Sequence, residues 1–327
     1  MDVLSDAIAA MRVGSPSSSR LRGSAADWCT RLAAYDGAGF HIVLRGSCWV
    51  LPDGGAPVTL GPGDAVLLPH GTAHVLADRP VDAEAVARAV PFEQWRDRPE
   101  NHSESGEFEV LCGKYRLDRR GQHPLMAELP PLIHLPARIG DQRELRSAIE
   151  LLGMELDQRR PGSCVAVPGL LDLLLVYMIR AWMTMSRKGV WPAALDDPVV
   201  AAALRAIHTD PGSAWTNDRL AAEVDVSRAT LARRFTSVVG MAPMGYLSWW
   251  RLTTAAGMLR GTTDPLATVA SRVGYANAYA FSHAFRKQFG VSPGRYRRTA
   301  PRPSAERDDD ADSFAETAAA GLAPHAP

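Results

Sequence analysis

The sequence predicts an α+β protein of several domains, with an antiparallel β-barrel in its N-terminal part and an all-α domain in its C-terminal part. Between residues 40 and 76, and again over 107–117, short runs rich in branched and aromatic residues alternate with Gly- and Pro-containing turns. From residue 141 onward, apolar residues recur at the helical period instead. A chain of 327 residues is long enough for two domains that each bury a core.

The N-terminal segment predicts a short helix and a cytoplasmic protein. Residues 1–14 carry acidic residues where a secretory signal would carry Lys or Arg, and they lack a long apolar core. The four cysteines include no close pairs, which suits reduced thiols. The apolar face of the expected helix consists of Leu4, Ala7, Ile8 and Met11.

Changes of pattern divide the chain into four segments. RRPG at 159–162 separates two apolar helices, expected over 141–159 and 166–186. The second helix contains Asp172 and Arg180, which would be costly in a bilayer, so we expect a buried helix and no membrane partner. Such a pair can bury its apolar faces within one chain or against a second copy, and we expect a homodimer. The segments are a β-rich domain over 1–136, a helical linker and dimerisation region over 137–195, a basic helical domain over 196–300 and a disordered tail over 301–327.

The charge of the chain is unevenly distributed, although the formal net charge is zero. Residues 196–300 carry 13 Lys and Arg against 7 Asp and Glu, a net of +6, and residues 301–327 carry 2 against 6, a net of −4. A basic block followed by an acidic, Pro- and Ala-rich tail is typical of a polyanion-binding domain with a disordered end. A solvated basic face would give the same totals.

The basic block contains two similar units, each with a short helix, a tight turn and a longer helix. In the first unit, Asp225 and Val226 make the turn and Ser227 caps the longer helix. In the second unit, Gly274 makes the turn and Asn277 is the cap. This is the helix-turn-helix arrangement, whose second helix enters the major groove of double-stranded DNA. A connecting helix expected at PMGYLSWWRLTTAAGMLR would hold the two units about one DNA turn, roughly 34 Å, apart.

The outward faces of the two longer helices supply the candidate DNA contacts. Leu231 and Phe235 face inward in the first unit, and the stripe Phe281, Phe285 and Phe289 faces inward in the second. Arg can donate two hydrogen bonds to guanine, and Ser and Thr are more permissive. The candidates are Arg228, Ala229, Thr230, Arg233, Arg234, Asn277, Ala278, Tyr279, Ser282, His283, Arg286 and Arg298.

The stretch from Trp215 to Arg298 closely resembles the AraC/XylS family of bacterial transcription regulators. The most diagnostic segment is VASRVGYANAYAFSHAFRKQFGVSPGRYRR. The resemblance implies a sequence-specific DNA-binding regulator that contacts RNA polymerase, with activation or repression left open. Asp225 replaces the usual turn Gly, and Ala278 and Ala280 lie where polar residues are common. These departures concern the base preference and not the fold.

The N-terminal domain carries a second resemblance, in the stretch GDAVLLPHGTAH. The pattern G-x5-P-x-G-x2-H is met by Gly63, Pro69, Gly71 and His74, and it is similar to the second motif of the cupin barrel, where that His is a metal ligand. Residues 40–136 resemble the cupin-type sensor domain of some AraC-family regulators. The resemblance implies that this domain senses a small molecule, a metal or an oxidant, whose identity the sequence does not reveal.

The histidines of the β domain do not reproduce a cupin enzyme site. The first motif of metal-binding cupin enzymes has an H-x-H pair followed by a carboxylate, but His41 stands alone and Val43 occupies the second place. We therefore expect no enzyme, and a metal-dependent cupin enzyme fused to a DNA-binding module is the weaker alternative. A barrel that only dimerises is the other alternative.

His41, His74 and Cys112 lie on predicted strands or their ends and can converge inside the barrel. With a fourth ligand such as Cys48 or His123, they would suit zinc or another borderline-soft divalent metal. No cofactor is certain from the sequence. Cys112 is also the redox candidate, although a thiol reacts only when its pKa is depressed. A hydrogen-bonded core histidine is the alternative for His41.

Overall fold

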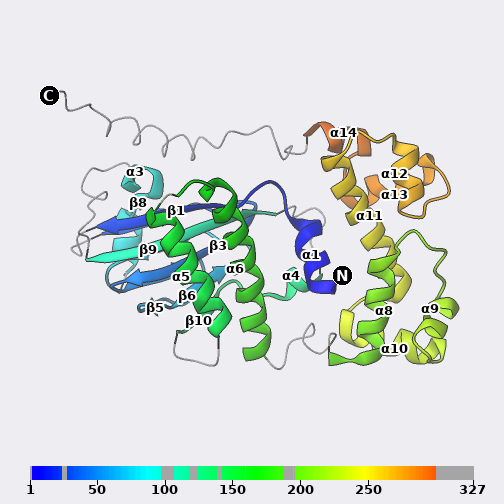
Figure 1. Ribbon diagram of the computed structural model, residues 1–327, viewed down its shortest axis with the longest axis horizontal. Coiled ribbons are helices and arrows are strands. Elements are labelled where there is room, and N and C mark those ends of the chain that lie inside the picture. The colour runs from blue at the N-terminus through cyan, green and yellow to red at the C-terminus, as the bar shows by residue number, and fades with distance from the viewer. Residues whose placement is uncertain are drawn as a thin grey trace.

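The computed structural model describes residues 2–23, 28–80, 82–96, 107–117, 124–137, 142–158, 160–186, 194 and 196–299. A β-rich part and a helix pair lie on one side of the molecule, and a bundle of helices lies on the other (Figure 1). Helix α1 (Val3–Met11) lies between them. The disordered tail expected over 301–327 lies outside the described residues.

The β-rich part, predicted as an antiparallel β-barrel, consists of two five-stranded sheets. The first sheet is antiparallel throughout, and its strands in spatial order are β1 (Ser17–Gly23), β9 (Phe108–Arg116), β3 (Gly37–Arg45), β6 (Ala65–Leu68) and β10 (Ile133–Leu135). The second sheet has the order β5 (Val58–Leu60), β4 (Cys48–Pro52), β7 (His74–Ala77), β2 (Cys29–Leu32) and β8 (Val90–Pro91), and its β2–β8 pair is parallel.

Alternation along β3 assigns the two faces of the first sheet. Phe40 and Ile42 belong to the core that continues into the helices, and Val43 belongs to the core shared by the two sheets. His41 therefore points between the sheets. Two short helices, α2 (Ala83–Arg88) and α3 (Phe92–Arg96), follow β7. A further short helix, α4 (Pro124–Glu128), follows β9.

The two predicted apolar helices are confirmed as α5 (Arg143–Gln158) and α6 (Ser163–Met185), which pack against each other beside the first sheet. The guanidinium of Arg22 lies within 3.0 Å of Asp157 and 2.9 Å of Glu109, which ties α5 to strand β9. By length and composition α6 is able to cross a membrane, a test that a core helix also passes. Leu171, Leu174 and Met178 on α6 are fully buried.

The C-terminal part is a chain of helices with two apolar cores. Their bounds are α8 (Pro198–Thr209), α9 (Asn217–Glu223), α10 (Arg228–Val239), α11 (Pro243–Gly261), α12 (Leu266–Arg272), α13 (Ala278–Phe289) and α14 (Pro293–Thr299). Leu231 and Phe235 are fully buried in the first core, as predicted. Phe281, Phe285 and Phe289 form the second core with α11, so the predicted connecting helix contributes to both.

Helix α1 joins the two parts through a buried polar contact. It packs against α8 and α11, and its predicted apolar face contributes to the large core that continues from the first sheet into the helices. His208 Nδ1 lies 3.2 Å from Asp6 Oδ2, and His208 Nε2 lies 2.8 Å from the Tyr246 hydroxyl. The imidazole also stacks on Trp250, with ring centroids 3.8 Å apart. On the other side, Arg12 pairs with Asp172 of α6.

Candidate functional site

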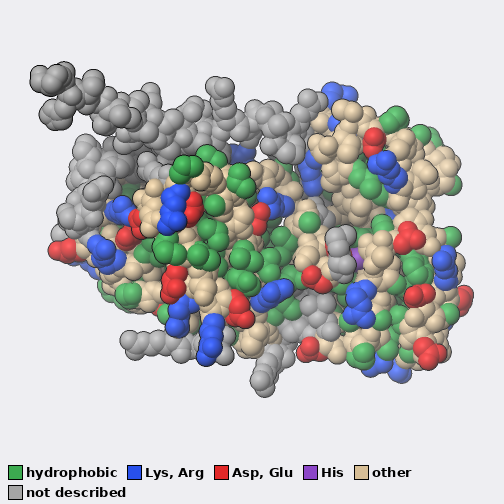
Figure 2. All heavy atoms as spheres, viewed as in Figure 1, with side chains coloured by type: hydrophobic (Ala, Val, Ile, Leu, Met, Phe, Trp, Pro, Cys, Tyr) green, Lys and Arg blue, Asp and Glu red, His purple; other side chains and the backbone are tan. Residues whose placement is uncertain are grey.

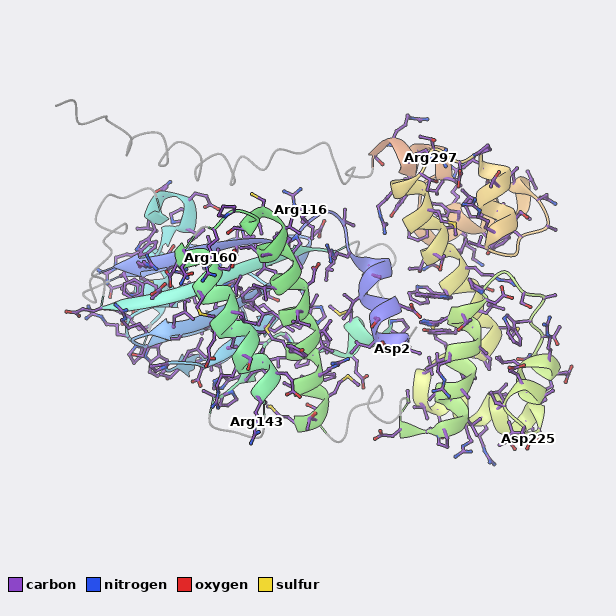
Figure 3. The ribbon with its side chains drawn as sticks, in the orientation of Figure 1. Asp2, Arg116, Arg143, Arg160, Asp225 and Arg297 are labelled. Carbon is purple, nitrogen blue, oxygen red and sulfur yellow. The ribbon has the colours of Figure 1, made fainter. Side chains whose placement is uncertain are left out.

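The first unit of the helical domain has the geometry of a helix-turn-helix. The hydroxyl of Ser227 accepts a hydrogen bond from the amide of Thr230 at 3.2 Å, so Ser227 caps α10 as predicted. Asp225 (Figure 3) lies in the left-handed region, with φ 52°, where Asp is tolerated better than most residues. The amide of Val226 donates to the carbonyl of Ala221 at 3.0 Å and closes the turn.

The second unit repeats this geometry. Gly274 has φ 80°, and the Asn277 side chain accepts from the amide of Ala280 at 2.8 Å, so Asn277 caps α13. The amide of Tyr275 donates to the carbonyl of Ala270 at 2.9 Å, which is the same five-residue bond that closes the first turn. The repeat seen in the sequence is therefore a repeat of backbone structure.

Most of the candidate DNA contacts lie on the solvent side of α10, α13 and α14. Neither α10 nor α13 contains an Asp or Glu, so their outer faces are neutral or basic. Tyr279, near the start of α13, has 84% of its surface exposed. The exposed candidates are Arg228, Ala229, Arg233, Asn277, Tyr279, His283, Arg286 and Arg298, and the half-buried ones are Thr230, Arg234, Ala278 and Ser282.

The candidate arginines differ in their protein partners. Arg234 Nε lies 3.0 Å from Asp197, the cap of α8, so its charge is already paired inside the protein. Arg228 Nη1 lies 3.8 Å from Asp218, in an exposed pair that contributes little stability. Arg233 makes no ion pair with any residue that the structure describes, and its guanidinium is available to a phosphate or a base.

Two exposed basic residues near the same face were not among the candidates. Lys287 lies in the last turn of α13, and Arg295 lies in the first turns of α14. The helical period places Lys287 off the predicted groove-facing stripe, and the short α14 has no apolar pattern from which to assign a face. The regional excess of basic residues was the only signal for them.

The structure brings His41, His74 and Cys112 together in the core between the two sheets. Their exposed fractions are 2%, 3% and 5%. His41 is the central member, since its Nδ1 lies 2.9 Å from Cys112 Sγ and its Nε2 lies 2.7 Å from His74 Nε2. His74 Nδ1 lies 2.8 Å from the carbonyl oxygen of Thr72.

The Thr72 carbonyl determines which ring nitrogens of His41 and His74 carry a proton, because a carbonyl oxygen can only accept a hydrogen bond. His74 Nδ1–H donates to Thr72, so neutral His74 accepts at Nε2 from His41 Nε2–H. The free Nδ1 of His41 then accepts from the Cys112 thiol. Burial lowers the pKa of His74 to about 4 and that of His41 well below its usual value, and it raises the pKa of Cys112. All three groups are therefore neutral and satisfied.

The three side chains form a linear series of hydrogen bonds, whereas the sequence predicted that they could hold a zinc-like metal together with a fourth ligand such as Cys48 or His123. Cys112 and His74 contact opposite nitrogens of His41, so one ion cannot bind all three side chains in this geometry. Among the described residues no group of three or more His, Cys, Asp or Glu is placed to hold a metal. Lys114 adds positive charge that also lowers the pKa values of both histidines. Cys48 is buried, and His123 lies outside the described residues.

The surroundings of Cys112 do not favour the redox role that the sequence predicted for it. A reactive thiol needs a depressed pKa and access to its oxidant. The raised pKa and the burial of Cys112 supply neither. Cys164, at the start of α6, is exposed.

Comparison with known proteins agrees with this architecture. A family model described as "Cupin" matches residues 2–184, more than half of the chain, and one described as "Helix-turn-helix domain" matches residues 220–299. A putative AraC-like transcription regulator of Streptomyces lividans is 34% identical, with 91% of this chain and 98% of that protein covered. One of Streptomyces antibioticus is 32% identical, with 91% and 99% covered.

A solved structure of the DNA-binding domain of AdpA, in complex with a target DNA, aligns with 33% of this chain and 99% of that one, at 32% identity and a TM-score of 0.31. The relatives of similar length are named as regulators of transcription and not as enzymes. The predicted fold class and the expectation of a regulator that is not an enzyme are confirmed. This chain belongs to the AraC-like family of DNA-binding transcription regulators, with a cupin domain ahead of its helix-turn-helix domain.

Proposed function

We propose that this regulator inserts α10 and α13 into two major-groove segments on one face of its operator. The observation that carries the proposal is the pair of capped helices with exposed N-terminal halves and no acidic residue. Arg233 and Arg286 are positioned to reach base edges or phosphates, and Tyr279 offers an exposed ring. Phosphate contacts supply much of the affinity, so binding weakens as salt rises.

The test replaces one groove-facing arginine and one matched arginine elsewhere. The DNA is a duplex recovered by selection from random sequence with the full-length protein. Arg233→Ala should weaken binding by about five- to a hundredfold, the effect of losing one base or phosphate contact. Arg205→Ala removes the same charge from an exposed position on α8. Equal affinities for the two variants would remove Arg233 from the interface.

A homodimer formed through the helix pair is the second part of the proposal. Hydrophobic side chains gather over α5 and α6 on the surface shown in Figure 2. Leu151 and Met154 on α5 are each 47% exposed, and Val165 and Leu173 on α6 are 79% and 38% exposed. A contiguous apolar patch with contributions from two helices is typical of an association surface, and a two-fold dimer would cover it on both copies.

The oligomeric state tests this surface. Sedimentation equilibrium should give a dimer for the wild type at micromolar concentration and a monomer for the double variant Leu151→Glu, Leu173→Glu. Glu150→Gln, an exposed change on the same helix, should remain dimeric. A monomeric wild type, or a double variant that remains dimeric, would overturn the proposal.

The signal is proposed to enter through the β domain, which would bias one arrangement of the helical domain by its differential affinity. A zinc-like metal at His41 and His74 is the narrower form of this proposal. Two imidazole ligands of one zinc ion lie roughly 3.3 Å apart for N–Zn bonds of about 2.0–2.1 Å, so the two Nε2 atoms would have to separate from 2.7 Å. About one equivalent of metal, lost in His74→Ala, would support it. No metal after incubation with zinc would leave an organic effector or a dimerising scaffold.

Contact with RNA polymerase and residence in the cytoplasm complete the proposal, because a DNA-bound regulator acts where the polymerase works. Transcription reconstituted from purified components, with and without this protein, tests the contact. An unchanged transcript level on a template that carries the selected operator would remove it.

A further inference from the structure

The two helix-turn-helix units touch each other through backbone segments that lie outside the connecting helix. The loop of residues 210–213, between α8 and α9, belongs to the first unit, and Gly274 forms the turn of the second. A Cβ added to Gly212 would lie 2.7 Å from the carbonyl oxygen of Arg272. A Cβ on Gly274 would lie 2.8 Å from the carbonyl oxygen of Gly212. The two backbones therefore meet at a distance that only glycine allows.

Arg251 of α11 occupies this junction. Its Nε donates to the carbonyl of Pro211 at 2.7 Å, and its Nη2 donates to the carbonyl of Ser213 at 2.7 Å. The same Nη2 is the atom nearest to the position of a Cβ on Gly274, at 2.7 Å. One guanidinium thus binds the loop of the first unit and covers the turn of the second.

The loop that Arg251 binds is also held by hydrogen bonds of its own. The amide of Ser213 donates to the Asp210 side chain at 3.1 Å, and the Trp215 indole N–H donates to the Asp210 carbonyl at 2.8 Å. A rigid loop transmits its position to the start of α9. Fixing the loop against the second turn therefore fixes one unit against the other.

We propose that Arg251 is the positioning residue that sets the spacing and orientation of the two DNA-reading units, and so the spacing of the two operator segments that this protein accepts. If α11 were the only connection, the two units would be free to tilt relative to each other about that helix. The second attachment, through the loop and the turn, removes that freedom before DNA is bound. A pre-organised pair of binding units gains affinity for two segments at one separation and loses it at others.

The test uses the full-length protein and the two-segment duplex obtained by selection. The affinity for this duplex is compared with the affinities for duplexes that carry one base pair more or fewer between the segments, and for duplexes that keep only one segment. Arg251→Ala should bind the selected duplex about tenfold more weakly, since it loses the pre-organised second contact. Its affinity for a duplex with one segment should equal that of the wild type. The loss of affinity caused by altered spacing should be smaller than in the wild type.

Arg260→Ala is the matched control. Arg260 lies on the same helix and carries the same charge, and its Tyr296 partner belongs to the second unit. This variant should keep the wild-type penalty for altered spacing. Gly212→Ala is the independent variant, because it leaves Arg251 in place and forces the loop and the second unit apart. It should show the same relaxed spacing, and it decides the question if Arg251→Ala does not fold.

Two results would overturn the proposal. If Arg251→Ala and Gly212→Ala both keep the wild-type penalty for altered spacing, the junction does not set the geometry. If Arg251→Ala loses affinity equally for one and for two segments, with normal circular dichroism, Arg251 acts as an ordinary electrostatic contact.

Discussion

The His208 contact between α1 and the helical domain predicts a specific loss of stability in acid. His208 is 6% exposed, and burial lowers its pKa to about 3. The unfolded chain titrates this group near 6.5, so between pH 6.5 and 3 the unfolded state binds more protons than the folded state. The stabilisation is fully present above pH 6.5 and is lost as pH falls towards the folded pKa.

The magnitude follows from the difference between the two pKa values. At pH 5.0 the unfolded histidine lies 1.5 units below its pKa, and each unit is worth about 1.4 kcal/mol, so His208 should cost about 2 kcal/mol relative to pH 7.5. Asp6, 3.2 Å away, acts in the opposite direction, because burial raises its pKa and makes proton uptake favour the folded state. A carboxyl titrates mostly below pH 5 in the unfolded chain, which sets the lower limit of the experiment.

The assay is urea unfolding followed by tryptophan fluorescence at pH 7.5 and 5.0, for the wild type, His208→Gln and His283→Gln. Other buried histidines contribute equally to all three proteins and cancel when the pH-induced changes are compared. His208→Gln should lose about 2 kcal/mol less than the wild type on acidification. His283 is exposed, so His283→Gln should match the wild type.

Two results would refute this reasoning. Equal acid losses for the wild type and His208→Gln would mean that His208 does not stay neutral when folded. A wild type that gains stability at pH 5.0 relative to His208→Gln would indicate a protonated His208 paired with Asp6, with a raised pKa.

Three further predictions concern single side chains. Phe285→Ala should lower the free energy of unfolding by about 3–5 kcal/mol, because the ring is fully buried in the second core, and urea titration would measure it. Ser227→Ala should cost about 1 kcal/mol through loss of the α10 cap, and a cost no larger than that of Ser237→Ala, within the same helix, would contradict the capping role. In the native protein a maleimide should label exposed Cys164 well before buried Cys112, by mass spectrometry; equal rates would restore Cys112 as a redox site.

The helical domain could be predicted closely from the sequence because its signals are local. Caps, turn residues and four-residue aromatic spacing act within a few positions, and Ser227, Asn277 and the Phe281 stripe lie as expected. Even Asp225 takes the left-handed turn conformation where glycine is usual. The exposure of Arg233 followed from the same period.

The features that sequence could not supply depend on contacts between distant segments. Strand alternation brings His41, His74 and Cys112 together, but it does not determine which ring nitrogen meets which partner, and that choice separates a ligand shell from a hydrogen-bonded chain. Arg251 binds two backbone carbonyls, which leave no side-chain pattern. The pairing of α1 with His208 crosses 202 positions of sequence.

Strand β9 links the interior of the β domain to helix α1. It carries Cys112 in its middle, and beyond that residue the carbonyl of Arg116 accepts from the amide of Val13 at 2.9 Å, just past the end of α1. Arg12 forms a β-bridge with Leu117 beside it. A displacement of β9 along its length would therefore pull on α1 unless these bonds break. One strand thus connects the polar centre of the cupin domain to the helix that packs against the DNA-binding domain.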